Sequence, residues 1–116
     1  MKIDYTGKSI VVTGAAGGIG RASAELFASL GGLVLISDFN AEGLQATANA
    51  INEAGGTAVA QVADVTDPDQ VIAMVDIAHE KFGKIDVLFN NAGGSFPTPM
   101  AEIDRNEFER IRSLNL

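Results

Sequence analysis

The chain contains no cysteine and no tryptophan, and it has one tyrosine and one histidine among 116 residues. The absence of cysteine excludes a disulfide framework and a thiolate metal site, as is typical of a protein in a reducing compartment. With 8 lysine or arginine residues against 15 aspartate or glutamate residues, the net charge of −7 disfavours a nucleic-acid or anionic-membrane surface. No apolar run approaches the roughly 20 residues of a membrane span, and no signal-peptide pattern opens the chain. We therefore expect a cytoplasmic protein.

What the chain does contain is mostly small and aliphatic. Hydrophobic residues make up 47% of the sequence and aromatic residues only 6%, and there are 13 glycines. This composition is typical of an ordered α/β protein. The length allows one domain at most, residues 1–116, which is about half the size of a complete doubly wound sheet.

The most informative stretch is V-V-T-G-A-A-G-G-I-G-R, residues 11–21. The β-branched residues 10–12 predict a short strand that is buried on both faces. After the glycines, apolar residues at three- and four-residue steps predict a helix with an inner face of Ile19, Ala22, Leu26, Phe27 and Leu30. The turn is then a helix N-terminus, whose unpaired N–H groups favour an anion. Three glycines would permit the turn, the close approach of a phosphate and the packing of the helix, namely Gly14, Gly18 and Gly20.

The residues around the turn indicate which phosphate it binds. A mononucleotide P-loop needs Lys and then Ser or Thr after its last glycine, whereas Arg21 and Ala22 follow Gly20, which excludes that site. The turn alone leaves open a tight connection that holds no ligand. The next predicted strand, residues 33–37, ends in Asp38, where a carboxylate can accept hydrogen bonds from a ribose diol. The two features together predict a dinucleotide site.

The remainder of the chain continues the alternation of strands and helices. Asn40 is the predicted cap of a helix to about residue 54, and residues 58–62 form the next predicted strand. Asp67, Pro68 and Gln70 have the pattern of a capping box that opens a third helix, which explains Asp67 and Asp69 without a metal. Residues 85–89 are a fourth predicted strand, and the capping box Asp104/Glu107 opens a last helix. We expect this last helix to run to the C-terminus.

The inner faces of the second and third helices follow from the apolar spacing. They comprise Leu44, Ala48 and Ile51 in one helix, and Val71, Met74, Val75, Ala78 and Phe82 in the other. His79 lies beside the second stripe and is interpreted as a solvated helix residue. The element order predicts an α/β fold with a doubly wound parallel sheet in strand order 3-2-1-4. The crevice then falls between the first and fourth strands.

Three short motifs occur in order along the chain: T-G-A-A-G-G-I-G at residues 13–20, Asp64-Val65 after the third predicted strand, and N-N-A-G at residues 90–93. With them the chain resembles the N-terminal half of a classical short-chain dehydrogenase/reductase, whose TGxxxGIG turn, adenine-contacting pair and NNAG motif they match. The resemblance implies a Rossmann-type half-domain that binds NAD(H) in an oxidoreductase, which transfers hydride between NAD and an alcohol or ketone as a homo-oligomer. The cofactor-binding residues that it implies are Gly14, Ala16, Gly18, Ile19, Gly20, Asp38, Asp64, Val65, Asn91, Ala92 and Gly93. It implies one catalytic residue, Asn115, and no metal ligand.

Charge at the end of the second strand favours NAD over NADP. A 2′-phosphate would lie close to Asp38, and the flanking positions 15, 16, 37 and 39 supply no compensating Lys or Arg.

The family's catalytic Ser and Tyr-x-x-x-Lys are absent from these residues, because Tyr5 precedes the first strand and is followed four positions later by Ser9. We therefore expect the 116-residue chain to be inactive alone, as a fragment or truncated product. The alternative is a non-catalytic nucleotide-binding or interaction module. In either case the uncovered fourth strand and last helix lead us to expect self-association.

Overall fold

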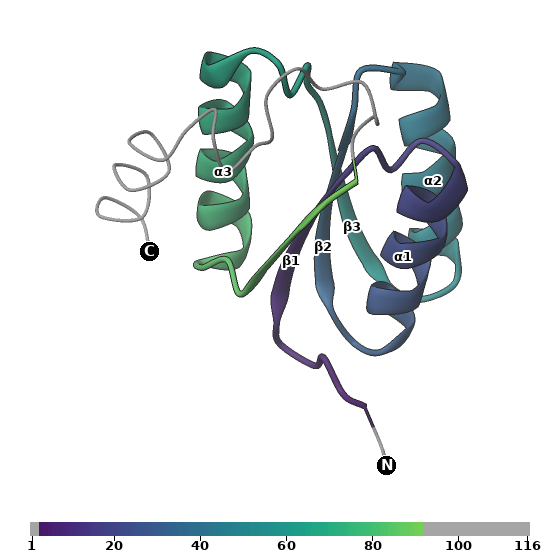
Figure 1. The fold of residues 1–116 in the computed structure, drawn as a ribbon. Helices are drawn as coiled ribbons and strands as arrows, with labels where there is room; N and C mark the ends of the chain where they lie inside the picture. Colours follow the sequence, from purple (N-terminus) through teal and green to yellow (C-terminus); the bar gives the residue numbers. More distant parts are fainter. Residues whose placement is uncertain (1–2, 92–116) are drawn as a thin grey trace.

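The computed structural model describes residues 3–91 of the chain. They form a parallel sheet with helices on both faces (Figure 1). The predicted helix 104–116, with Asn115, lies outside the described residues, as do Ala92 and Gly93. The elements in chain order are β1 (Ser9–Thr13), α1 (Gly18–Ser29), β2 (Leu33–Asp38), α2 (Ala41–Glu53), β3 (Thr57–Val62), α3 (Pro68–Phe82) and β4 (Val87–Asn90).

The order of the strands is β3-β2-β1-β4 and all three pairings are parallel, which confirms the predicted fold class. From β1 the chain adds β2 and then β3 on one side, and it then returns to place β4 on the other side of β1. The direction of strand addition therefore reverses at β1. Right-handed crossovers then place α1 and α2 on one face and α3 on the other, as Figure 1 shows. The carboxyl ends of β1 and β4 meet at this reversal, where open α/β sheets bind their ligands.

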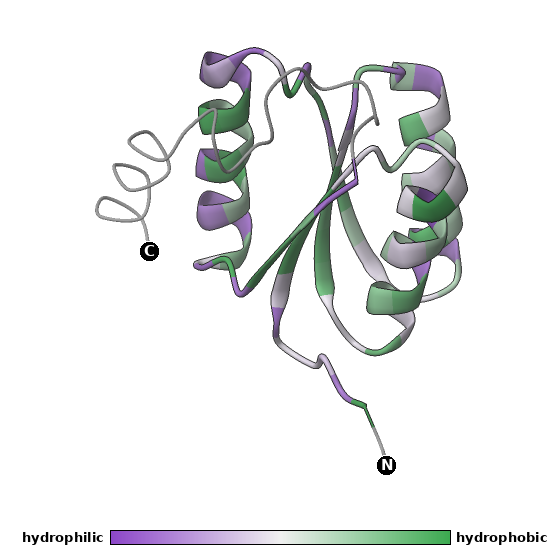
Figure 2. Ribbon diagram, viewed as in Figure 1, coloured by the Kyte–Doolittle hydropathy of each residue, from purple (hydrophilic) through white to green (hydrophobic). Residues whose placement is uncertain are grey.

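Strand β1 is buried at all five positions and separates two apolar clusters. Ile10 and Val12 pack on the face covered by α1 and α2, whereas Val11 packs under α3 with Met74. In Figure 2 the strands carry mostly the hydrophobic colour, and much of the outer side of α3 carries the hydrophilic one. The alternation of side chains along a strand supplies both clusters from one segment, which explains the continuous apolar run.

The predicted inner face of α1 is wrong in part. Ile19 and Leu26 are 71% and 58% exposed, and the buried residues of the helix are the small ones Gly20, Ala24 and Ala28. Small side chains let the helix axis approach the sheet, and this outweighs the area that a leucine would bury at a larger separation.

The predicted caps of α2 and α3 are confirmed, with one difference in detail. Asn40 Oδ1 accepts a hydrogen bond from Gly43 N–H at 3.1 Å, and Asp67 Oδ1 accepts one from Asp69 N–H at 3.0 Å. In a capping box, Gln70 would reach back to the N–H of its own cap. Instead its Oε1 accepts a hydrogen bond from Asp64 N–H at 2.8 Å, and the segment after β3 is thereby fastened to α3.

Asp86, just before β4, is hydrogen-bonded to the first residue of β1. This contact makes the free energy of unfolding depend on pH. Its Oδ2 accepts a hydrogen bond from Ser9 N–H at 2.8 Å and lies 3.4 Å from Lys84 Nζ. The hydrogen bond from Ser9 lowers the pKa of Asp86, with a smaller effect from Lys84. A pKa that is lower in the folded state contributes stability above the unfolded value of about 4, and this contribution is lost as the pH falls through the folded value.

We expect Asp86→Asn to lower the midpoint of thermal unfolding by about 2–5 °C at pH 7, and by less near pH 3. Circular dichroism melts at both pH values measure this difference. Glu80→Gln, on the exposed last turn of α3, is the control with the same change of charge. An equal effect of Asp86→Asn at both pH values would contradict the assignment.

Candidate cofactor-binding site

The candidate site lies at the carboxyl edge of the sheet, where three strand ends and one helix start come together. β1 leads through the turn at residues 14–17 into α1, β2 ends at Asp38 beside that turn, and β4 ends at Asn90 on its other side. The ends of β2 and β4 both pair with Thr13, through Ser37 and Asn90, so the turn lies between them. The sequence places predicted cofactor-binding residues on all three strand ends.

Two of the three motif glycines adopt a backbone conformation that favours glycine, and at the third there is no room for a Cβ atom. Gly14 and Gly18 have φ values of 67° and 58°, in the left-handed region that residues with a Cβ rarely adopt. A Cβ on Gly20 would lie 1.9 Å from the carbonyl oxygen of Gly14. Gly20 therefore allows the first turn of α1 to pack directly on the end of β1, the close packing that a dinucleotide turn uses.

No side chain of residues 3–91 caps the N-terminus of α1. Its N-cap is Gly17, and the first turn contains no acidic residue. Among the atoms of residues 3–91, a Cβ on Gly17 or Gly18 would meet none within 4 Å. The first N–H groups of a helix lack partners inside the helix, so here they can donate to an anion. The turn accordingly fits a pyrophosphate.

Two backbone N–H groups orient the carboxylate of Asp38, and one of them belongs to the glycine turn. Its Oδ2 accepts from Ala16 N–H at 3.0 Å, and its Oδ1 accepts from Asn40 N–H at 3.0 Å. Each carboxylate oxygen can accept a second hydrogen bond, so the group is oriented and retains capacity for a ribose diol. Phe39, the next residue, is 81% exposed and adds an apolar surface without a positive charge.

Thr47, on the buried face of α2, is hydrogen-bonded to the glycine turn and was not predicted from the sequence. It is fully buried, and its Oγ1 donates toward two carbonyl oxygens, that of Ala15 at 2.9 Å and that of Gly43 at 3.2 Å. The signal that could have identified it is a hydroxyl on the apolar inner face of a helix, beside Leu44 and Ala48. Thr47 fixes the carbonyl of Ala15, whose neighbour Ala16 holds Asp38.

Thr13 connects β1 to the predicted motif at the end of β4. Its Oγ1 donates to Asn90 Oδ1 at 2.9 Å and accepts from Asn91 N–H at 3.0 Å. Asn91 Nδ2 lies 2.8 Å from the point that a Cβ on Gly20 would occupy. The structure thus brings Asn91 against the glycine turn, across the boundary between β1 and β4.

The pair Asp64–Val65 follows β3 at the same edge, but its two side chains have different surroundings. Val65 is 7% exposed and packs under α3, so only its backbone can face a ligand. Asp64 is exposed, and its Oδ1 accepts from Thr66 N–H at 2.9 Å and from Thr66 Oγ1 at 2.6 Å. These two hydrogen bonds lower the pKa of Asp64, which therefore carries its charge at neutral pH.

The described part of the chain, residues 3–91, contains no group of three His, Cys, Asp or Glu side chains that could hold a metal ion. In the same residues no helix is long and apolar enough to span a bilayer.

Comparison with known proteins gives consistent matches. The profile of the short chain dehydrogenase family matches residues 8–116. The chain is 39% identical to 7alpha-hydroxysteroid dehydrogenase of Escherichia coli K12 over 110 residues, which are 95% of this chain and 43% of that protein. It is 45% identical over 107 residues to cis-4-hydroxycyclohexanecarboxylate dehydrogenase of Sinomonas cyclohexanicum, covering 91% of this chain and 43% of that protein.

Solved structures agree with the sequence comparisons. A 7 alpha-hydroxysteroid dehydrogenase complexed with NADH and 7-oxo glycochenodeoxycholic acid is 36% identical, with a TM-score of 0.80 over 98% of this chain and 49% of that one. A Burkholderia phymatum short chain dehydrogenase/reductase in complex with NAD is 38% identical, with a TM-score of 0.72 over 74% of this chain and 31% of that one. The chain thus spans less than half the length of these relatives, and over that length it belongs to the short-chain dehydrogenase/reductase family.

Proposed function

We propose that this chain is the NAD(H)-binding portion of a cytoplasmic, homo-oligomeric oxidoreductase that transfers hydride between NAD and an alcohol or ketone. The observation that carries the proposal is the carboxylate of Asp38, which the N–H groups of Ala16 and Asn40 orient beside an uncapped helix N-terminus. A ribose diol donates to such a carboxylate while the adjoining pyrophosphate accepts from the helix. The 43% to 49% share of the longer relatives supports the view that the chain is a portion.

In this proposal the residues of the chain bind and orient the dinucleotide. Gly14, Gly18 and Gly20 shape the turn, while Ala16 and Ile19 line the approach to the pyrophosphate. Ile19 is 71% exposed at the start of α1, so its side chain is available to a ligand. Asp64 and the backbone of Val65 would face the adenine, and Asn91 with Ala92 and Gly93 would form the opposite wall of the crevice.

When it is bound, the nicotinamide of the cofactor accepts or supplies the hydride. Among the residues of this chain, Asn115 is proposed to hold a proton-relay position, as the family's helix asparagine does. The Ser and the Tyr-x-x-x-Lys that would orient a carbonyl and transfer a proton are absent from the 116 residues. General acid–base assistance is worth about 100- to 10,000-fold, so we expect no steady turnover of an alcohol or ketone by this chain alone.

Titration of the 116-residue chain with NAD and with NADP tests the proposal. We expect weak binding of NAD and at least tenfold weaker binding of NADP, because the 2′-phosphate would meet Asp38 and positions 15, 16, 37 and 39 supply no Lys or Arg. Isothermal calorimetry measures both constants, with adenosine monophosphate as a probe for the adenine-ribose half. Tighter binding of NADP would contradict the role of Asp38, and no binding of any of the three would favour an interaction module.

A further inference from the structure

β3 is the outer strand of the sheet on the side away from β4, and in the described part of the chain no strand pairs with its outer edge. In a parallel sheet, successive residues of a strand direct their N–H and C=O groups alternately to one side and the other. The N–H of Ala63 donates to the carbonyl oxygen of Asp38 on β2 at 3.1 Å, so the odd-numbered residues of this segment point toward β2. The backbone groups of Ala58, Ala60 and Val62 therefore point outward.

Asn52, in the last turn of α2, is hydrogen-bonded to both outward groups of Ala58. Its Oδ1 accepts from Ala58 N–H at 2.9 Å, and its Nδ2 donates to the Ala58 carbonyl oxygen at 3.2 Å. One side-chain amide thus makes the two hydrogen bonds that a residue of a further strand would make there. Among residues 3–91, the outward groups of Ala60 and Val62 have no such partner. Asn52 therefore shortens the unpaired part of the edge to two residues.

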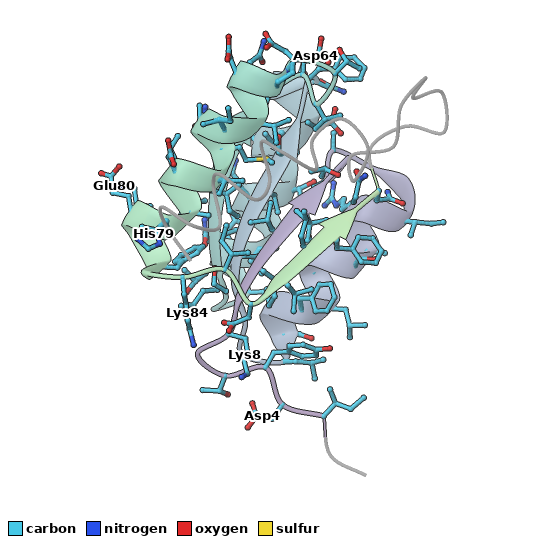
Figure 3. All side chains as sticks on the ribbon, turned by 60° about the vertical axis from the view of Figure 1, so that its left-hand side comes forward. Asp4, Lys8, Asp64, His79, Glu80 and Lys84 are labelled. Carbon is cyan, nitrogen blue, oxygen red and sulfur yellow. The ribbon has the colours of Figure 1, made fainter. Side chains whose placement is uncertain are left out.

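The sequence of β3 contains none of the usual protections of an exposed edge. Such an edge can pair with a strand of another chain, and proteins prevent this with charged side chains, prolines, bulges or very short strands. Residues 54–63 contain no charged residue and no proline, and all six residues of β3 pair with β2 in one continuous register. The next charged residue, Asp64, lies beyond the carboxyl end of the strand (Figure 3). Within residues 3–91, the edge is thus protected by Asn52.

We propose that Asn52 prevents β3 from pairing with β3 of a second copy of this chain. Two copies related by a two-fold axis present the same groups to each other, which makes an edge strand its own natural partner. In an antiparallel pair centred on Ala60, Ala58 of one copy lies opposite Val62 of the other. Asn52 of each copy then blocks one end of the ladder, and only the central pair of Ala60 residues remains.

A single residue pair is too short to hold two chains together, because stable strands need at least about three residues. The Asn52 side chain also fills part of the space that an incoming strand would occupy, about 4.8 Å from β3. The inference does not depend on the proposed function, because it concerns no ligand.

Asn52→Ala tests the proposal, since it removes both hydrogen bonds and exposes all three outward positions. We expect it to lower the dissociation constant for self-association at least about tenfold, measured by sedimentation over a dilution series. Asn49→Ala is the matched control on the same helix. Asn49 is exposed as well, but its Oδ1 accepts from Gln45 Nε2 at 2.9 Å and not from a strand. We expect this control to associate like the natural chain.

A second substitution identifies the surface through which the chains associate. The N–H of Ala60 points outward, so Ala60→Pro removes no hydrogen bond to β2 but prevents a strand from pairing at the centre of the edge. We expect the double variant Asn52→Ala, Ala60→Pro to associate like the natural chain. Val62→Lys, which adds a charge at a position that is 50% exposed, replaces Ala60→Pro if the proline variant does not fold.

Hydrogen exchange followed by NMR gives the same information residue by residue. In dilute Asn52→Ala, the amide of Ala58 should exchange at least about tenfold faster than in the natural chain, because its acceptor is lost. As the concentration rises, the amides of Ala58, Ala60 and Val62 should all become protected.

Two results would overturn the proposal. If Asn52→Ala melted at a lower temperature but associated like the natural chain, Asn52 would only fasten the turn between α2 and β3. If its association increased and neither Ala60→Pro nor Val62→Lys reversed the increase, the chains would be in contact elsewhere. Circular dichroism melts check that each variant folds.

Discussion

Gly20→Ala should lower the midpoint of thermal unfolding by at least about 10 °C and abolish detectable NAD binding. The added Cβ would lie 1.9 Å from the carbonyl oxygen of Gly14 and 2.7 Å from its carbonyl carbon, both backbone atoms. A flexible side chain could move aside, but the backbone at Gly14 is fixed by its left-handed φ of 67° and by the end of β1. The start of α1 must then move away from the sheet, and the turn loses the shape that binds a phosphate.

Gly17→Ala is the matched control, since both changes add one methyl group near the start of α1, at the N-cap or in the first turn of the helix. Its Cβ would meet no atom of the described residues within 4 Å, and its φ of −170° is extended backbone that any residue adopts. We expect this variant to melt within about 2 °C of the natural chain, and to bind NAD more weakly because the methyl group lies where the phosphate would approach. Circular dichroism melts and calorimetry separate the two effects. A Gly20→Ala protein with the natural melting temperature would contradict the packing argument.

Asp38→Asn should weaken NAD binding by about 10- to 100-fold and reduce the preference for NAD over NADP at least tenfold. The carboxylate accepts from two N–H groups at once, Ala16 and Asn40. An asparagine has one carbonyl oxygen, so its amide group would face one of those donors with donors of its own. The ribose then loses an oriented acceptor, and a 2′-phosphate no longer meets a full negative charge.

The control for charge is Glu42→Gln, an exposed residue in the first turn of α2 that makes neither of these hydrogen bonds. We expect it to change both constants by less than about twofold. Calorimetry with NAD and NADP on all three proteins measures the two ratios. If Asp38→Asn and Glu42→Gln changed the preference equally, the effect would come from net charge, and the orientation of Asp38 would carry no specificity.

The candidate site was predictable to the extent that it depends on local geometry. The left-handed glycines, the uncapped start of α1 and the carboxylate at the end of β2 all follow from residue types at fixed spacing, because strand, turn and helix each impose their own period. The hydrogen bond between Ala16 N–H and Asp38 joins residues 22 apart, and Thr47 reaches Ala15 over 32. Such contacts depend on how segments far apart in the sequence pack together, so a local sequence pattern cannot predict them.

The sequence by itself determined the element types, the two helix caps at Asn40 and Asp67, and the strand order, because a parallel sheet with right-handed crossovers leaves few alternatives. Only the tertiary structure decided which side of α1 faces the sheet. The apolar spacing favoured Ile19 and Leu26, but the sheet received Gly20, Ala24 and Ala28. The physical reason is that the stability of the core depends on the sum of its packing contacts, and not on the hydrophobicity of any single residue. A helix that lies close on small side chains lets Ile10, Val12 and Ile36 fill the core, while Ile19 and Leu26 remain exposed.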